Sequence, residues 1–219
     1  MSGYHCRKTS RNTKRKEHNK MVIVCEGETE IIYFNNYKSC VRKELEIKTP
    51  STNDTDPLSL VDFAISQIDR FGLSFKDGDS IWCVFDCDIN NDKQTKDRQI
   101  ASAKKKAIKK KINVCLSNPS FELWFLLHFD RLPGDSILTK EILLNRLSNK
   151  IPDYKKTTNY FEILSPKTKD ACENSKFLVE FHECNGSEII CVDSNPSTLV
   201  FKIIEDIQKF MQKETNNQE

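Results

Sequence analysis

The sequence predicts an α/β fold, in which a mostly parallel sheet is flanked by helices and followed by a helical C-terminal extension. Three short, continuously apolar runs are typical of strands that are buried on both faces, as parallel strands are: 21–25, 81–85 and 112–116. Segments with apolar residues at helical spacing separate these runs, and such alternation indicates βαβ units. With 219 residues, 37% of them hydrophobic, the chain can bury the core of one mid-sized domain with an extension.

The other elements of the first half follow from their own patterns. A helix is expected directly after the first run, over 28–40. Residues 44–48 (ELEIK) alternate between charged and apolar side chains, as in a half-buried strand. Apolar residues recur every three or four positions over 57–71, and this spacing predicts an amphipathic helix. A second, basic helix is expected over 94–110.

The second half has more helical signal than strand signal. Asn118 and Pro119 are expected to start an apolar helix within 117–129, whose first backbone N–H groups could hold a phosphate. The apolar residues of 188–192 (EIICV) predict one added strand. Further helices are expected near 137–149, 167–182 and 196–213.

The composition indicates a cytoplasmic protein. No run approaches the roughly 20 apolar residues that cross a bilayer, so no contact with a membrane is expected. The first residues are basic but lack the apolar stretch of a signal peptide. Nine cysteines occur without a CxxC pair, and several lie inside apolar runs, where a reducing compartment would keep them as small buried side chains.

Acidic residues directly follow two of the predicted strands. Glu26 and Glu30 come after the first strand, one helical turn apart, with a glycine between them that lets the backbone turn sharply. Asp86 and Asp88 follow 81–85, and this spacing projects both carboxylates to one side of an extended chain. Ligands bind outside the carboxyl ends of parallel strands, and clustered carboxylates attract hard cations. The sequence therefore predicts a site for Mg²⁺ or Mn²⁺.

Simpler interpretations of the acidic residues stay open. The glutamates can complement a helix N-terminus, and the aspartates can begin a polar loop. Glu28 and Asp92 are close in sequence, and either could join the site or only cap a helix. Glu122 would lie one turn into the helix of 117–129, as a further metal ligand or a general base. His128, on the same apolar helix, is more typical of a core histidine than of a catalytic one.

Basic residues are clustered rather than in large excess, since the net charge is only +2. Seven Lys or Arg residues lie between Arg7 and Lys20, and six lysines lie between Lys104 and Lys111. Such clusters can hold a phosphate backbone, although a solvated helix face explains them as well. Residues 195–198 form another expected helix start, where capping competes with anion binding. The candidate substrate-binding residues are Lys104, Lys105, Asn118, Lys155, Lys156, Asn195 and Ser197.

The strand followed by Glu-Gly-x-x-Glu, together with the later strand followed by Asp-x-Asp, resembles the Toprim domain over residues 20–130. This resemblance implies the compact α/β fold of topoisomerases, primases and several nuclease families. It also implies that Glu26, Asp86 and Asp88 coordinate a divalent metal for phosphoryl transfer, with Glu30 as an accessory ligand. The chain is then expected to have three parts: a basic flexible arm at 1–20, a Toprim-like metal-binding domain at 21–130, and a mainly helical part at 131–219 packed on it.

A closer resemblance covers nearly the whole chain. Segments VIVCEGE at 22–28, VFDxD at 84–88, SNPSFELWxLLHF at 117–129 and NPST at 195–198 are similar to those of the RloB-like family. The resemblance implies a bacterial protein linked to restriction loci and abortive phage infection, often beside an ATPase partner. Members commonly carry a lysine near the position of Thr29, and its absence weakens the case for a phosphate contact at that point.

The predicted function is that of a metal-dependent nuclease acting on DNA or RNA, tRNA included. Two alternatives stay open, because fold alone does not define function. One is a module that senses a nucleic acid or nucleotide and is active only with a co-encoded ATPase, and the other is a phosphoryl-transfer enzyme acting on a small nucleotide. The residues expected to be catalytic are Glu26, Glu30, Asp86, Asp88 and Glu122, and the expected metal ligands are Glu26, Asp86 and Asp88.

Overall fold

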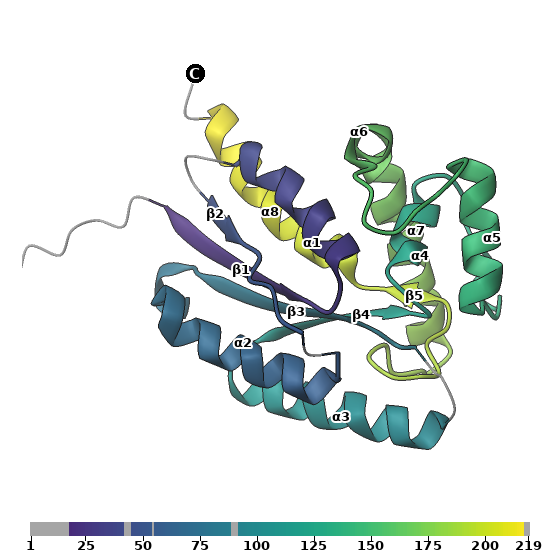
Figure 1. The fold of residues 1–219 in the computed structure, drawn as a ribbon, viewed down its shortest axis with the longest axis horizontal. Coiled ribbons are helices and arrows are strands. Elements are labelled where there is room, and N and C mark those ends of the chain that lie inside the picture. Colours follow the sequence, from purple (N-terminus) through teal and green to yellow (C-terminus); the bar gives the residue numbers. More distant parts are fainter. Residues whose placement is uncertain (1–17, 42–44, 54, 89–91, 217–219) are drawn as a thin grey trace, which may run out of the picture.

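The apolar runs of the first half form neighbouring strands of one sheet in the computed structural model (Figure 1). The strand order is β2-β1-β3-β4-β5, and each neighbouring pair is parallel except β4 and β5. The prediction of an α/β fold with a mostly parallel sheet is therefore confirmed. The strands are β1 (Asn19–Cys25), β2 (Leu45–Lys48), β3 (Ser80–Asp86), β4 (Asn113–Asn118) and β5 (Ser197–Thr198).

The structure describes residues 18–41, 45–53, 55–88 and 92–216. The predicted basic arm at 1–20 lies outside these residues, apart from its last three positions. Within the described part of the chain, no helix is long and apolar enough to cross a membrane.

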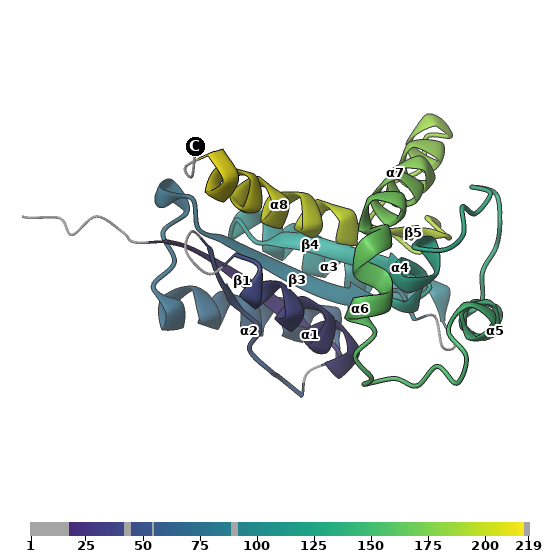
Figure 2. The ribbon, with the colours of Figure 1, turned by 90° about the horizontal axis from the view of Figure 1, so that it is seen from above.

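Alternate side chains of the central strands enter two separate hydrophobic cores, because successive residues of a strand point to opposite faces of the sheet. Ile23 and Cys25 of β1 belong to the core on one face, whereas Val22 and Val24 belong to the core on the other. The helices α1 (Glu28–Asn35) and α8 (Val200–Asn216) lie along the first face, and α2 (Pro57–Phe71) and α3 (Lys93–Lys109) lie along the second (Figures 1 and 2).

Capping residues explain where the helices of the second face begin and end. Asp56 caps α2 by accepting two backbone N–H groups of the first turn at 3.1 Å each, and Pro57 occupies the first helical position. Gly72 ends α2 in the left-handed conformation, with φ of 57°. Asp92 caps α3 by accepting the backbone N–H of Gln94 at 3.0 Å. In the described structure, Asp92 thus serves as a helix cap.

The remaining helices gather beyond the carboxyl ends of the strands (Figures 1 and 2). The helix α8 then returns across the sheet, where Val200, Ile203 and Ile207 join the same core as β1. The expected C-terminal helices are present, although α8 starts at residue 200 rather than 196. The helices beyond the carboxyl ends of the strands are α4 (Glu122–Leu127), α5 (Lys140–Lys150), α6 (Phe161–Leu164) and α7 (Thr168–Cys184). Short 3-10 turns occur at Asn36–Ser39, Phe75–Asp77 and Ser165–Lys167.

The prediction of a strand at 188–192 is wrong. The place beside β4 is taken by β5 instead. The Ser194 hydroxyl donates to the carbonyls of Ile189 (2.6 Å) and Cys191 (3.0 Å). Side-chain hydrogen bonds thereby satisfy carbonyl groups that would otherwise pair with a neighbouring strand, so a β-branched run folds as an irregular loop.

The helix predicted within 117–129 begins later than expected. Asn118 is the last residue of β4, and α4 starts only at Glu122. The prediction that Asn118 and Pro119 start this helix is therefore wrong. The physical reason is strand pairing, because the backbone at 117–118 lies between β3 and β5 in the sheet.

Candidate active site

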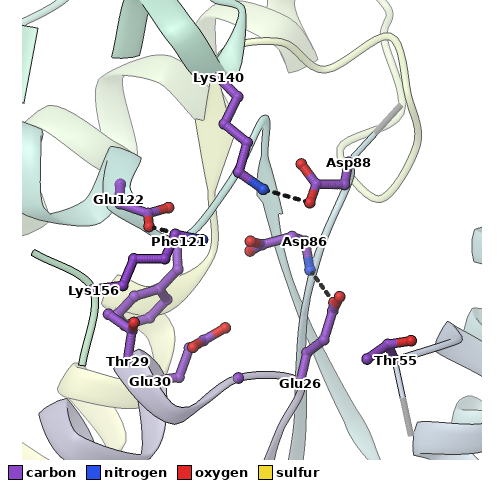
Figure 3. Close-up of a pocket in the computed structure, with 11 residues that line it drawn as sticks. Glu26, Thr29, Glu30, Thr55, Asp86, Asp88, Phe121, Glu122, Lys140 and Lys156 are labelled. Atoms are coloured by element: carbon purple, nitrogen blue, oxygen red, sulfur yellow. Dashed lines mark hydrogen bonds and ion pairs between the residues drawn. The ribbon is translucent and has the colours of Figure 1, made fainter. Parts of the chain in front are cut away.

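The turn between β1 and α1 brings two glutamates to the carboxyl end of the sheet. The Glu26 backbone N–H donates to the Val84 carbonyl (3.0 Å), so pairing with β3 continues to this point. The Glu26 carboxylate accepts a hydrogen bond from the Asp86 backbone N–H at 3.0 Å (Figure 3). A Cβ atom at Gly27 would lie 2.8 Å from Glu30 Oε2. Glycine at this position therefore leaves room for the Glu30 carboxylate.

Asp86 is the last residue of β3 and Asp88 lies two positions later, and the two carboxylates have different surroundings. Asp86 is 9% exposed, and its Oδ1 atom is buried without a hydrogen-bond partner among the described residues. Asp88 accepts a charged hydrogen bond from Lys140 of α5, with 2.5 Å between Nζ and Oδ2 (Figure 3). In the described part of the chain, a cation thus neutralises Asp88, whereas Asp86 has no such partner.

Glu122 faces the same space from the start of α4 (Figure 3). Its side chain is 2% exposed, and it accepts a hydrogen bond from Ser120 Oγ at 2.6 Å. The Tyr154 hydroxyl donates to it at 3.4 Å, and Lys156 Nζ lies 3.5 Å away. These contacts hold the carboxylate in one orientation, although the exposed Lys156 contributes only weakly because water screens its charge.

These side chains line one pocket of about 220 Å³, which has room for several water molecules or a phosphate group. All five carboxylates that are predicted to be catalytic contribute to its wall. Two ammonium groups are also present, so negative charge exceeds positive charge. The lining residues are Glu26, Gly27, Thr29, Glu30, Thr55, Asp86, Asp88, Phe121, Glu122, Lys140 and Lys156.

Burial and mutual repulsion make the ionised carboxylates of this pocket unfavourable. Burial raises the pKa of the Asp86 carboxyl, and the charges of Glu30 and Glu26 raise it further. Burial raises the pKa of Glu30 to about 7, even though its own backbone N–H stabilises the ionised form. Burial also raises the pKa of Glu26, and this effect is opposed by the hydrogen bond from the Asp86 N–H. A bound cation would relieve both the desolvation and the repulsion.

The donor set suits a hard divalent cation such as Mg²⁺ or Mn²⁺, because it consists of carboxylate oxygens. Asp86 Oδ1, which lacks a donor among the described residues, is the atom that most needs such a partner. In the free protein, the carboxylates are not yet arranged around one point where they could coordinate an ion. Within the described ranges, no three Asp, Glu, His or Cys side chains meet closely enough to hold an ion. Coordination by Asp88 would require its contact with Lys140 to open.

The lysine run of α3 lies away from the acidic pocket. Lys104 forms an ion pair with Glu188 and lines a separate depression near the start of β4, at the opposite end of that strand from the pocket. Lys105 is exposed on the same helix, and Lys155 is exposed in the loop after α5. Of the four predicted substrate-binding lysines, Lys156 lines the pocket and the other three do not.

Asn118, Asn195 and Ser197 have structural partners. Asn118 donates from Nδ2 to the Val192 carbonyl (3.1 Å) and accepts at Oδ1 from Asn195 Nδ2 (3.0 Å). Asn195 also binds both backbone groups of Leu138, accepting from its N–H at 2.8 Å and donating to its C=O at 2.9 Å. Ser197 is buried within β5. We call Asn118, Leu138, Val192 and Asn195 the asparagine network.

Two further candidates lie outside the pocket wall. Glu28 is exposed in the first turn of α1. His128 is 2% exposed, and its Nδ1 lies 2.8 Å from the carbonyl oxygen of Trp124. Burial lowers the pKa of His128 to about 4. Its environment is therefore that of a neutral core histidine.

Three polar groups of the site were not expected from the sequence: Lys140, Tyr154 and Ser120. Lys140 reaches Asp88 from 52 residues further along the chain, and no local pattern links the two. The same is true of Tyr154, which lies 32 residues after Glu122. Ser120 could have been found, because a hydroxyl two residues before a carboxylate in a helix-start turn can donate to it.

Comparisons with known proteins show to which family the chain belongs. The RloB-like protein family matches residues 21–207, a range that includes every carboxylate of the pocket. No curated protein and no solved structure matches the chain. Because the family match covers well over half of the 219 residues, the chain belongs to the RloB-like protein family, as its sequence motifs predict.

Proposed function

We propose that the protein is a metal-dependent nuclease that hydrolyses phosphodiester bonds in DNA or RNA, tRNA included, as part of defence against phage. The link of RloB-like proteins to restriction loci supports the role in defence. One observation carries the enzymatic part: Asp86 Oδ1 is buried in a pocket of five carboxylates and has no partner among the described residues. Buried polar atoms without partners and carboxyls with raised pKa values are concentrated at functional sites.

Glu26, Asp86 and Asp88 are the proposed ligands of Mg²⁺ or Mn²⁺, as their resemblance to the Toprim motif implies. When bound, such an ion polarises the scissile phosphate and lowers the pKa of an attacking water. Lys140 and Lys156 supply the positive charges of the pocket wall, and these can hold phosphate oxygens. Glu30, which lines the same pocket, is the proposed acceptor of the proton that the attacking water releases.

The direct test is incubation of the purified protein with total nucleic acid, in Mg²⁺ or Mn²⁺ and separately in EDTA, followed by mapping of the product ends. We expect cleavage that EDTA stops and that Asp86→Asn abolishes. Asp62→Asn is the matched control, because Asp62 is a surface carboxylate of α2 that pairs with Lys106. The control should cleave like the parent. Parental cleavage by Asp86→Asn would refute the assignment of the site.

The ion pair between Asp88 and Lys140 favours a second candidate function, a sensing module that becomes active only with a co-encoded ATPase. In that case, the partner would have to open this contact before Asp88 binds a cation. Lys140→Met separates the two candidates. If Lys140 holds substrate phosphate, the variant loses cleavage. If Lys140 keeps the site closed, the variant cleaves without the ATPase, whereas the parent requires it.

A further inference from the structure

The acidic pocket adjoins a second pocket of different character. The second pocket has a volume of about 290 Å³, and it shares Asp88 and Lys140 with the acidic pocket. The apolar side chains of Pro119, Ile137 and Leu138 form part of its remaining wall. An acidic pocket that suits a phosphate when a divalent cation is bound therefore lies next to a pocket that suits an apolar group.

The asparagine network makes one wall of this second pocket rigid. Asn195 binds the backbone of Leu138 at two points, at 2.8 and 2.9 Å. Asn195 Nδ2 also donates to Asn118 Oδ1 at 3.0 Å, next to the buried Pro119. A wall that is already ordered loses little conformational entropy when a ligand binds, and this favours affinity.

Ile137 lies at the same pocket with 81% of its surface exposed, whereas its neighbour Leu138 is 3% exposed. An apolar ligand that covered Ile137 would remove this surface from water, which is favourable. The exposed isoleucine therefore provides a contact surface that the free protein leaves unused.

We infer that this second pocket, which we call the base pocket, receives the nucleobase next to the scissile phosphate. The inference rests on the proposed function, since it requires a phosphate in the acidic pocket. A base can lay its apolar ring face against the exposed Ile137, beside the buried Leu138 and Pro119. Lys140, common to both pockets, can meet the adjoining phosphate. A volume of about 290 Å³ is at the lower end of the range for small-molecule sites, and it suits one ring system rather than a base pair.

The base pocket implies a substrate class. A base that is stacked and paired within a duplex cannot enter a pocket between protein side chains. The favoured substrates therefore have an unpaired nucleotide at the cleavage site, as in a single strand, a loop or a flipped-out position.

The test uses the full-length protein, labelled with ¹³C in the methyl groups of isoleucine and leucine, in the presence of Mg²⁺. Deoxyadenosine 5′-monophosphate and 2-deoxyribose 5-phosphate are titrated separately, because they share the sugar and the phosphate, and the second carries a hydroxyl in place of the base. We expect the ring current of the base to shift the methyl signals of Ile137 and Leu138, and the sugar phosphate to leave them in place. Ile108 is the internal control, because it is 64% exposed on α3, and its signal should not move.

Substitution of the exposed isoleucine gives the second measurement. Ile137→Ala should weaken the affinity for the nucleotide about tenfold, because alanine buries less apolar surface against the base, and leave the affinity for the sugar phosphate unchanged. The matched control Ile108→Ala should change neither. The inference is overturned if the nucleotide leaves the signals of Ile137 and Leu138 in place, or if Ile137→Ala binds it as tightly as the parent.

Cleavage assays keep this inference separate from the proposed function. A parent protein that cleaves single-stranded and fully paired oligonucleotides at equal rates contradicts the base pocket but leaves the nuclease proposal intact. Methyl shifts caused by the base, in a protein that cleaves neither oligonucleotide, support the base pocket and count against the nuclease.

Discussion

Two buried polar regions lie at the ends of neighbouring strands, and they are built in opposite ways. In the asparagine network, which includes the last residue of β4, the amide oxygen and the amide nitrogen of both Asn118 and Asn195 have hydrogen-bond partners. In the acidic pocket, which follows β1 and β3, Asp86 Oδ1 has no partner among the described residues. The neighbouring charges of Glu30 and Glu26 there oppose ionisation of Asp86.

This difference indicates which region stabilises the fold and which region is suited to bind a cation. Buried amides with complete hydrogen bonds contribute to stability. Clustered buried carboxylates lower stability through desolvation and repulsion, and such a cost is typical of sites whose charge is used by a ligand. Substitutions should therefore affect stability in the asparagine network and ligand binding in the acidic pocket.

The largest expected effect is on metal binding. Asp86→Asn keeps the shape of the side chain but removes its charge, so we expect the affinity for Mn²⁺ to fall at least about 100-fold. The melting temperature should stay the same or rise, because repulsion among the carboxylates decreases. Calorimetric titration and thermal unfolding measure the two quantities, with Asp62→Asn as the control. Equal Mn²⁺ affinity in Asp86→Asn and the parent would place the site elsewhere.

The asparagine network should show the reverse behaviour. Asn195→Ala removes three hydrogen bonds and leaves the buried Leu138 backbone without them, so the free energy of unfolding should fall by about 3 kcal/mol. The affinity for Mn²⁺ should be nearly unchanged. Asn174→Ala is a matched control, because Asn174 donates to the Leu127 carbonyl (2.9 Å) and its loss should cost about 1 kcal/mol. Urea unfolding that gives the same loss for both variants would contradict a structural role for the network.

The hydrogen bonding of His128 is intermediate between that of the asparagine network and that of the acidic pocket. Its Nδ1 is bonded, whereas its Nε2 has no partner in the described part of the chain. Burial lowers its pKa from 6.5 to about 4, so its contribution to stability is fully present above pH 6.5 and is lost as the pH falls through 4. The loss should reach about 3 kcal/mol at most. His128→Leu should lack this loss in urea unfolding between pH 6.5 and 4, and parallel profiles for variant and parent would contradict the prediction.

Glu30 should make the stability depend on pH in the opposite direction from His128. Its pKa is raised from 4.5 to about 7, so its contribution is fully present below pH 4.5 and is lost as the pH rises through 7. We expect a smaller change in stability than for His128, because Glu30 titrates together with the neighbouring carboxylates and only part of the new charge forms on Glu30 itself. Glu30→Gln should weaken this decline in melting temperature. Mg²⁺ should do the same in the parent but not in Asp86→Asn, and an equal effect of Mg²⁺ on both proteins would argue against the site.

The smallest expected effect concerns the lysines of α3. Replacing Lys104 and Lys105 with Gln should reduce the salt slope of nucleic-acid binding by less than about 2, since each phosphate contact contributes about 0.9 and Lys104 already pairs with Glu188. Cleavage at saturating substrate should not change. Lys156→Gln, in contrast, should lower both binding and cleavage, because Lys156 lines the acidic pocket. An unchanged slope for the double variant would assign its two lysines to a solvated helix face.

The sequence by itself determined the strands β1, β3 and β4 and the carboxylates that follow the first two. Apolar runs and helical spacing are local signals, because they depend on residues only a few positions apart. Parallel strands end at one edge of the sheet, so Glu26 and Asp86 could be expected to meet although they lie 60 residues apart. The candidate carboxylates were therefore accessible before the structure.

Only the tertiary structure decided which partners surround these carboxylates. Lys140 reaches Asp88 across 52 residues, and Asn195 reaches Asn118 across 77. The strand expected at 188–192 failed for the same reason, because the Ser194 hydroxyl and β5 took the hydrogen bonds that a strand there would need. Competition for hydrogen bonds and for space in the core involves all elements at once, and a pattern of neighbouring residues does not contain its outcome.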